Sequence, residues 1–233
     1  MWLADRWKDY EVIDCSDGEK LERWKKYILL RPDPQVIWST PKQNKDWKKL
    51  NGHYHRSAKG GGEWEFFDLP QEWTINYTLP IDKKLTFHLK PFSFKHTGLF
   101  PEQAANWDWF SQKIEKAVKS GREIKVLNLF AYTGGATLAA AAAGAHVTHV
   151  DASKGMVTWA KENAVSSGLG DAPLFFLINS YTTGLQPAVL NYMISTVLKK
   201  YDGFVTAEEI GIPVSSNGLV LPCGASGRWE HNL

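Results

Sequence analysis

One continuous stretch, residues 125–151, constrains the fold of this chain most strongly. It begins with an apolar run from Val126 to Phe130 and then reaches a turn that contains the adjacent glycines Gly134 and Gly135. An alanine-rich segment follows, and a β-branched run closes on Asp151. The order predicts a strand, a glycine turn, a helix, a second strand and a terminal carboxylate. This is the layout of a nucleotide-type cofactor site in an α/β fold.

Each part of this stretch has a physical role in the predicted site. The glycines allow a ligand to approach the backbone, and the turn presents N–H groups at a helix N-terminus. Asp151, at the end of its strand, is placed to accept hydroxyl protons from a ribose. In the alternative interpretation, the glycines form only a tight turn and Asp151 only begins the next helix.

The turn itself narrows the choice of cofactor. Dinucleotide sites require Gly-x-Gly-x-x-Gly, whereas residues 131–136 read Ala-Tyr-Thr-Gly-Gly-Ala and lack the first glycine. We therefore expect a ligand that has ribose and adenine without a pyrophosphate, such as S-adenosylmethionine. A nicotinamide-dependent oxidoreductase is the least favoured alternative.

Residues 127–164 resemble the cofactor half of a class I S-adenosylmethionine-dependent methyltransferase. They are most similar to bacterial enzymes of the ribosomal RNA large-subunit methyltransferase family. The segment 95–110, KHTGLFPEQAANWDWF, resembles the loop and helix that precede the core in that family. The segments 174–193, 203–214 and 218–229 resemble its last strands and connecting helix. The resemblance thus extends from about residue 90 to the end of the sequence.

The resemblance implies an α/β, Rossmann-like methyltransferase sheet with a β-rich N-terminal part. It also implies S-adenosylmethionine as cofactor and RNA, ribosomal in this family, as substrate. In the family, the loop around residues 95–103 folds over the cofactor, so Phe100 and Gln103 would approach it, and His96 less so. The implied cofactor-binding residues are Gln103, Asn128, Phe130, Ala131, Tyr132, Thr133, Gly134, Gly135, Asp151, Ala152 and Ser153.

The chain departs from the family pattern after Pro173. The fourth strand of the family carries an Asn/Asp-Pro-Pro-Tyr-type motif, and this chain has no Pro-Pro. The run 174–180 matches the fifth strand, so the third and fourth strands are predicted to be missing between Pro173 and Leu174. We expect the run to move in beside Val126–Phe130, which would bring the catalytic candidates Asn179 and Tyr181 to the acceptor site.

The residue types near this acceptor site favour one kind of methylation. Carbon-5 methylation of a pyrimidine needs a cysteine nucleophile, and the run 174–181 contains none. Cys223 fits a small buried residue better than a nucleophile. We therefore expect N- or O-methylation. Two alternatives stay open: an internally shortened, non-catalytic relative that binds cofactor or RNA, and a methyltransferase that acts on a small molecule or a protein.

Composition divides the chain into a β-rich part, residues 1–94, and the methyltransferase part, residues 95–233. Nine of the eleven tryptophans precede residue 110. A helix is predicted from Pro101, with Gly121 as its stop. Its shared apolar face is formed by Trp107, Phe110, Ile114 and Ala117. Strands are predicted at Tyr27–Leu30, Val36–Ser39, Trp73–Tyr77 and Leu85–Leu89.

A basic segment between Lys42 and Trp64 indicates contact with RNA. Cations for phosphates alternate there with the rings of Trp47 and Tyr54, which is the composition of a single-strand binding surface. The predicted RNA-binding residues are Lys45, Lys48, Lys49, Arg56 and Lys59. A solvated charged loop is the alternative. His53 and His55 lie two residues apart with no third ligand nearby in the sequence, so we expect no metal.

The whole sequence of 233 residues is long enough to bury a full core. It has no apolar run of about 18 residues and no secretory signal, so we expect no membrane partner. The cysteines Cys15 and Cys223 form neither a metal spacing nor a disulfide framework, which favours the cytoplasm. The net charge of +2 does not by itself indicate nucleic-acid binding, and the sequence leaves the oligomeric state open.

Overall fold

The structure is a computed structural model that describes residues 3–57, 60–92 and 95–178. The chain divides into two compact units. Unit 1 comprises Met1–Thr78 and Lys84–Ala105, and unit 2 comprises Leu79–Lys83 and Asn106–Leu233. The division into functional parts at residues 1–94 and 95–233 stays a prediction.

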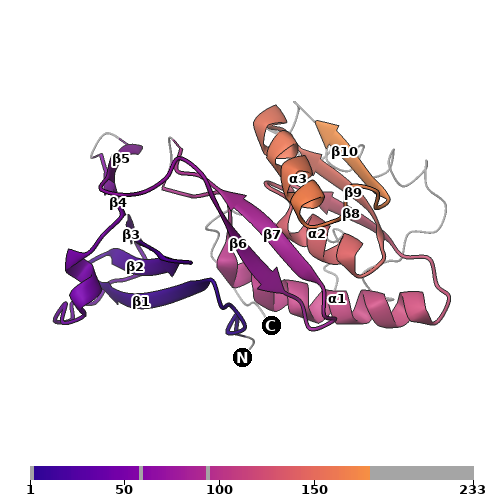
Figure 1. Cartoon of the computed structure of the whole chain (residues 1–233), viewed down its shortest axis with the longest axis horizontal. Helices are drawn as coiled ribbons and strands as arrows, with labels where there is room; N and C mark the ends of the chain where they lie inside the picture. The colour runs from indigo at the N-terminus through magenta and orange to yellow at the C-terminus, as the bar shows by residue number, and fades with distance from the viewer. Residues whose placement is uncertain (1–2, 58–59, 93–94, 179–233) are drawn as a thin grey trace, which may run out of the picture. The chain divides into compact units, whose positions relative to one another are not determined.

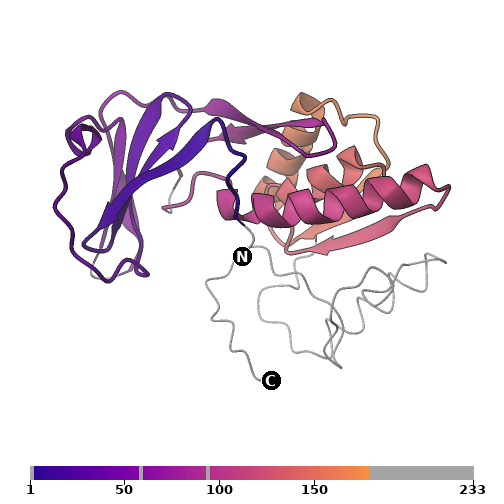
Figure 2. The same ribbon diagram turned by 90° about the horizontal axis from the view of Figure 1, so that it is seen from below.

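Unit 1 contains a five-stranded sheet in the order β1-β2-β3-β4-β5 (Figures 1 and 2). Neighbouring strands are antiparallel except β3 and β4, which pair in parallel through two residue pairs. A 3-10 helix, η1, precedes β4. The bounds are β1 Tyr10–Ser16, β2 Glu19–Trp24, β3 Tyr27–Pro32, η1 Lys45–Lys48, β4 Gly52–Arg56 and β5 Gly62–Phe66.

The second sheet of unit 1 is the antiparallel hairpin of β6 (Trp73–Thr78) and β7 (Lys84–Leu89). Alternate residues of both strands are fully or almost fully buried, as expected for a sheet with one face in the core. The 3-10 helix η2 (Pro101–Gln103) follows and leads directly into the first α-helix.

A buried ion pair lies inside unit 1. The Arg31 guanidinium donates to both carboxylate oxygens of Glu22, at 2.6 and 2.8 Å, and the Tyr10 hydroxyl donates to the same carboxylate at 2.7 Å. Burial alone would raise the pKa of Glu22, but the charge and hydrogen bonds of Arg31, together with the charge of Lys20 and the hydrogen bond from Tyr10, lower that pKa to about 2. The carboxylate is therefore ionised, and a bidentate pair of this kind is stable in the core only because its hydrogen bonds are satisfied.

Unit 2 is built around a parallel sheet in the order β10-β9-β8. Each parallel connection needs a crossover, and helices supply both of them: α2 joins β8 to β9, and α3 joins β9 to β10 (Figure 1). The helix α1 precedes the sheet. The bounds are α1 Ala104–Lys119, β8 Lys125–Leu129, α2 Gly135–Ala142, β9 His146–Asp151, α3 Lys154–Ser166 and β10 Leu174–Ile178.

The core of unit 2 forms where α1 and α2 meet the sheet. Phe110, Ile114 and Ala117 of α1 pack against a buried cluster that includes Ala140 of α2 and Val147 of β9. The predicted apolar face of α1 is thus confirmed. The short side chains of α2 leave little volume between this helix and the strands. They allow the glycine turn that precedes α2 to lie close to the end of the sheet.

The position of β10 corrects one prediction. The run 174–179 was expected to lie beside Val126–Phe130, but β10 pairs with β9 on the side away from β8. It takes the place of a third strand, because the short link after α3 brings it back next to β9. The described sheet therefore needs no gap between Pro173 and Leu174. The residues after Ile178 lie outside the described part of the chain.

Most of the other predicted elements are confirmed, with one exception in unit 1. Residues 36–39 do not form a strand. Instead, the carbonyls of Val36 and Trp38 accept the N–H groups of Gly18 and Asp17, at 3.0 and 2.9 Å. The β-branched and aromatic residues of this segment therefore close the turn between β1 and β2 in place of pairing with a strand.

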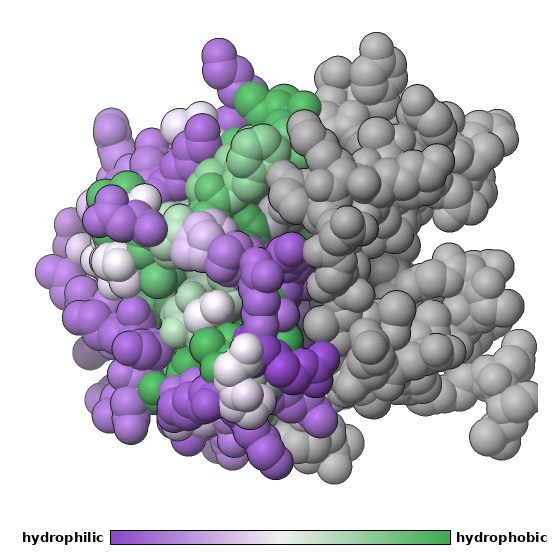
Figure 3. Space-filling model, turned by 90° about the vertical axis from the view of Figure 1, so that its right-hand side faces the viewer, coloured by the Kyte–Doolittle hydropathy of each residue, from purple (hydrophilic) through white to green (hydrophobic). Residues whose placement is uncertain are grey.

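Apolar side chains reach the surface of unit 2. Phe175 and Ile178 of β10 are 51% and 52% exposed. Hydrophobic atoms also show among hydrophilic ones on the face drawn in Figure 3. Among the described helices, none combines the length and the apolar character that a membrane span requires.

Candidate cofactor site

The turn between β8 and α2 has an unusual backbone. Phe130 and Tyr132 adopt positive φ angles of 53° and 52°, and Gly134 has a φ of 90°. A left-handed conformation costs a residue with a side chain about 1–2 kcal/mol. Such strain persists only where surrounding contacts hold it, and it concentrates at functional sites. The turn is therefore held in shape by its neighbours.

Asp151, the last residue of β9, is the main support of this turn. Its Oδ2 accepts the N–H of Tyr132 at 2.8 Å, and its Oδ1 accepts the N–H of Ser153 at 2.9 Å. The Ser153 hydroxyl in turn accepts the N–H of Met156 and caps α3. One carboxylate thus joins the turn after β8 to the turn after β9, at the carboxyl ends of two neighbouring parallel strands.

The remaining capacity of this carboxylate fits a ribose. An ionised carboxylate has about four acceptor positions, and backbone N–H groups occupy two of those of Asp151. One position on each oxygen remains for the two hydroxyls of a ribose. The side chain is only half-buried, so a ligand has access to it. Ligands of open parallel sheets bind at this end of the strands.

Packing inside the protein accounts for the two glycines of the turn, whereas the sequence suggested that they allow a ligand to approach the backbone. A Cβ on Gly135 would lie 2.5 Å from Cζ2 of Trp107, so this glycine makes room for the indole of α1. Gly134 is the left-handed residue at the start of α2, and its Cβ would meet Leu138 and Ala160 at 3.0 and 3.1 Å. Close packing within the protein explains both glycines without a ligand.

The contact between Gly135 and Trp107 leads to a testable prediction. Gly135→Ala should lower the free energy of unfolding by about 1–3 kcal/mol, because the added methyl group overlaps the buried indole. Chemical denaturation followed by circular dichroism measures the loss. Gly155→Ala in α3 is the matched control, because a Cβ there meets nothing closer than 3.7 Å. Equal effects of the two substitutions would contradict this account.

A chain of buried polar side chains lies beneath the turn. Asn128 Nδ2 donates to Thr137 Oγ1 at 2.9 Å, and the Thr137 hydroxyl lies 2.9 Å from Nδ1 of His149. These residues connect β8, α2 and β9. The direction of the hydrogen bond between the Thr137 hydroxyl and Nδ1 depends on which ring nitrogen of the neutral imidazole carries the proton. Among the described residues, neither Nε2 of His149 nor Oδ1 of Asn128 has a partner.

This arrangement keeps His149 neutral. Burial, and to a lesser extent the charge of Lys161, lowers the pKa of His149 from 6.5 to about 4. An unfolded chain binds a proton on this histidine below pH 6.5, whereas the folded chain does so only near pH 4. The stability that the neutral form contributes is therefore complete above pH 6.5 and is lost as the pH falls toward 4.

The pH dependence can be measured by comparison with a variant that does not titrate. From pH 7 to pH 4, the free energy of unfolding of the wild type should fall relative to that of His149→Gln by at most about 3 kcal/mol. Urea denaturation at a series of pH values gives the difference. A difference that stays constant over this range would contradict the assignment.

The other predicted cofactor residues have different environments. Ala131 is buried and donates its N–H to the carbonyl of Val150 at 3.0 Å. Thr133 is buried, and its carbonyl accepts from Asn163 of α3 at 2.9 Å. Ala152 lies between Asp151 and Ser153 in the second turn. Asn128 lies beneath the turn, and its side chain contacts Thr137 of α2, so we expect it to position the turn through Thr137.

The described structure does not test the placement of three predicted residues at this site. Gln103 belongs to η2 and to unit 1, so its approach to a cofactor stays a prediction. Asn179 and Tyr181 lie outside the described residues. Sequence reasoning also missed the supporting residues Thr137, His149 and Asn163. Their signal was a polar residue on the buried face of a helix or strand, at a position where an apolar residue is normal.

A hollow of about 320 Å³ lies at the opposite end of the same sheet. Its lining includes Lys125, His146 and Leu174, the first residues of β8, β9 and β10. Ligands of parallel α/β sheets bind at the carboxyl ends of the strands, and this hollow lies at the amino ends. We therefore do not assign the cofactor to it.

In unit 1, the predicted RNA-binding cations are exposed. They are Lys45 and Lys48 of η1, Lys49 and Arg56, while Lys59 lies outside the described residues. The predicted aromatic partners are less available. Tyr54 is buried, and the indole N–H of Trp47 donates to Asp14 at 2.8 Å. Cations, but not Tyr54, are thus presented for nucleic-acid contact.

The fold places a third possible ligand, Glu65, beside His53 and His55, which their spacing in the sequence did not indicate. Both lie on β4, and Glu65 of β5 stands directly opposite His53. His55 Nε2 lies 2.8 Å from Oε2 of Glu65. Burial, followed by the charge of His55, lowers the pKa of His53 below its ordinary value. The sequence did not show this group because the pairing of β4 with β5 creates it.

Comparisons with known proteins agree with this fold. No family model matches the chain. The ribosomal RNA large subunit methyltransferase K/L of Alteromonas mediterranea is 32% identical over 194 residues, which are 78% of this chain and 24% of that protein. The protein of the same name from Shewanella frigidimarina is 38% identical over 92 residues, 39% of this chain and 12% of that protein. The chain thus spans a quarter or less of the length of these relatives.

Solved structures give the same result. The crystal structure of the S-adenosylmethionine-dependent methyltransferase from Agrobacterium tumefaciens is 39% identical, with a TM-score of 0.66, and covers 73% of this chain and 52% of that one. A structure from Streptococcus mutans has a TM-score of 0.57 at 16% identity, over 84% of this chain and 50% of its own, and shows the fold alone. The chain therefore has a Rossmann-like methyltransferase fold with a β-rich N-terminal region.

Proposed function

We propose that this chain, a relative of the class I S-adenosylmethionine-dependent methyltransferases, binds S-adenosylmethionine at the carboxyl ends of β8 and β9. The observation that carries the proposal is the Asp151 carboxylate, which is fixed by two backbone N–H groups and retains an acceptor position on each oxygen. The similarity to the Agrobacterium and Alteromonas methyltransferases supports it.

The residues of the site bind and orient the ligand. The Asp151 carboxylate accepts hydrogen bonds from the ribose hydroxyls. The backbone from Ala131 to Gly135 passes beneath the methionine moiety. Ser153 fixes the second turn by capping α3. When bound, S-adenosylmethionine would supply a methyl group on a sulfonium: the acceptor attacks the methyl carbon, the bond from that carbon to sulfur breaks, and S-adenosylhomocysteine leaves. Catalysis then depends mainly on alignment of the acceptor with that methyl group.

RNA is the proposed methyl acceptor. The relatives from Alteromonas and Shewanella are named as ribosomal RNA methyltransferases, which supports a ribosomal substrate for this chain. The exposed cations around η1 supply phosphate contacts. We propose methylation at nitrogen or oxygen. Asn179 and Tyr181 lie outside the described residues, and the pairing of β10 with β9 removes the reason for placing them on the acceptor side. Location in the cytoplasm is consistent with this substrate and is also a proposal.

Two other activities remain as alternatives. A non-catalytic relative would use the same site to bind cofactor without transferring the methyl group. A methyltransferase with a small-molecule or protein substrate would use the site fully but would not need the exposed cations of unit 1. Transfer of a radiolabelled methyl group to ribosomal RNA separates both alternatives from the proposal.

Cofactor binding provides the first test of this function. Calorimetric titration of the full chain with S-adenosylmethionine should show one saturable site. Asp151→Ala should weaken binding at least roughly tenfold, because it removes both ribose acceptors and the support of Tyr132 and Ser153. Asp171→Ala, which removes an exposed carboxylate of the same unit, is the matched control and should bind normally. Equal binding by the two variants would contradict the proposed site.

RNA binding provides the second test. Simultaneous Lys48→Glu and Lys49→Glu substitutions should weaken binding to a ribosomal RNA fragment. Each phosphate contact that is lost lowers the number of counterions released on binding, and that release favours binding. The slope of log affinity against log salt should fall by about 0.7–0.9 for each contact. Filter binding over a salt series measures both effects. The control exchanges two other adjacent exposed lysines, Lys83→Glu and Lys84→Glu. If the control weakens RNA binding equally, the affinity depends only on the net charge of the chain, and the proposed contact at Lys48 and Lys49 is contradicted.

A further inference from the structure

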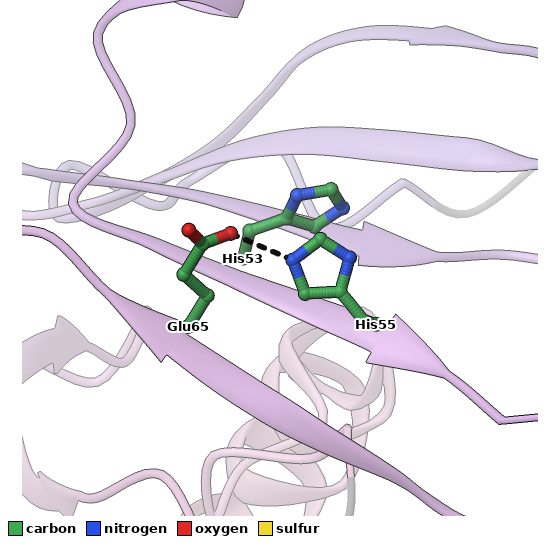
Figure 4. A group of neighbouring side chains, drawn as sticks. All are labelled: His53, His55 and Glu65. Carbon is green, nitrogen blue, oxygen red and sulfur yellow. Dashed lines mark hydrogen bonds and ion pairs between the residues drawn. The ribbon is translucent and has the colours of Figure 1, made fainter.

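The face of unit 1 around β4 carries a group of side chains that the proposed function does not use. His53 and His55 alternate along β4, so both imidazoles project from the same face of the sheet. Glu65 on β5 pairs directly with His53, and it therefore projects from the same face. Figure 4 shows the two rings next to each other with the Glu65 carboxylate beside them.

We propose that His53, His55 and Glu65 form a binding site for a divalent zinc-type metal ion. One ligand atom from each of the three residues lies within 4.8 Å of the others. Zinc bonds of about 2.0–2.1 Å at tetrahedral angles separate neighbouring ligand atoms by about 3.3 Å. His55 Nε2 and Glu65 Oε2 are 2.8 Å apart, and the centroids of the two imidazoles are 3.8 Å apart. Side-chain rotations that turn the ring nitrogens and the carboxylate toward one point would convert this group into a coordination shell.

Glu19 of β2 contacts His53 beside this group of three and would become a fourth ligand if its carboxylate turned toward the ion. Its Oε1 lies 3.4 Å from Nε2 of His53, and its Oε2 binds Lys42 at 2.7 Å. One oxygen is therefore directed toward the histidines while the other is neutralised by a lysine. A shell of two imidazoles and two carboxylates, or two imidazoles, one carboxylate and water, satisfies a four-coordinate ion. Such an ion would tie β2, β4 and β5 together.

The chemistry of the group selects the class of metal. Magnesium and calcium prefer shells made only of oxygen ligands. Two imidazoles favour zinc and the later divalent transition metals instead. His55 and Glu65 are 46% and 52% exposed, so an ion can reach the group from solvent without opening the fold. The alternative is a simple pair of hydrogen bonds between histidine and glutamate.

Metal titration of the full chain separates these two interpretations. Zn²⁺ titrated by calorimetry should bind saturably with one ion at this site, and an equal concentration of Mg²⁺ should not compete. His53→Ala, His55→Ala and Glu65→Gln should each weaken Zn²⁺ binding at least roughly tenfold. This follows because the loss of an outer-shell partner alone costs about 10–100-fold. In the absence of metal, these variants should retain the wild-type circular dichroism spectrum.

A matched control exists in the β6–β7 hairpin. His88 also contacts a glutamate, Glu72, and no second histidine contributes to that pair among the described residues. His88→Ala should therefore leave Zn²⁺ binding unchanged. Visible absorption of bound Co²⁺, which reports a tetrahedral site, should be present in His88→Ala and lost in His55→Ala. Unchanged Zn²⁺ affinity in His55→Ala, or no binding of Zn²⁺ to the wild type, would overturn the proposal.

Discussion

The carboxylate of Asp151 is the interaction on which the candidate cofactor site depends. It accepts one N–H from the turn after β8 and one from the turn after β9, and so holds the carboxyl ends of two parallel strands in one arrangement. The left-handed backbone at Phe130 and Tyr132 is stable only with such support. Because each oxygen keeps an acceptor position, the group that stabilises the turn is also the group that can bind a ribose.

The surrounding packing restricts the turn further. Trp107 fills the space that a side chain at residue 135 would need, and Asn163 holds the carbonyl of Thr133. Beneath it, the hydrogen bonds from Asn128 through Thr137 to His149 connect two strands and a helix. The site is therefore built in advance of ligand binding. Preorganisation of this kind reduces the entropy that binding would otherwise cost.

The sequence predicted the local elements of unit 2 well and their partners less well. Glycines, an alanine helix and a β-branched strand ending in Asp151 are local signals, and all of them were found at the expected positions. The place of β10 depends on which neighbour it pairs with, and the apolar run 174–178 contains no information about that choice. The same reason explains the group of His53 and Glu65, which only the pairing of β4 with β5 brings together.

Asp151 and the two turns that it joins are the proposed binding site of the cofactor. Amide chemical shifts of the ¹⁵N-labelled chain, recorded during titration with S-adenosylhomocysteine, test it directly, because that compound keeps the ribose and adenine of the cofactor. We expect the amides of Tyr132 and Ser153, which donate to Asp151, to be among those that shift most. Shifts that concentrate instead around Lys125, His146 and Leu174, at the other end of the sheet, would contradict it.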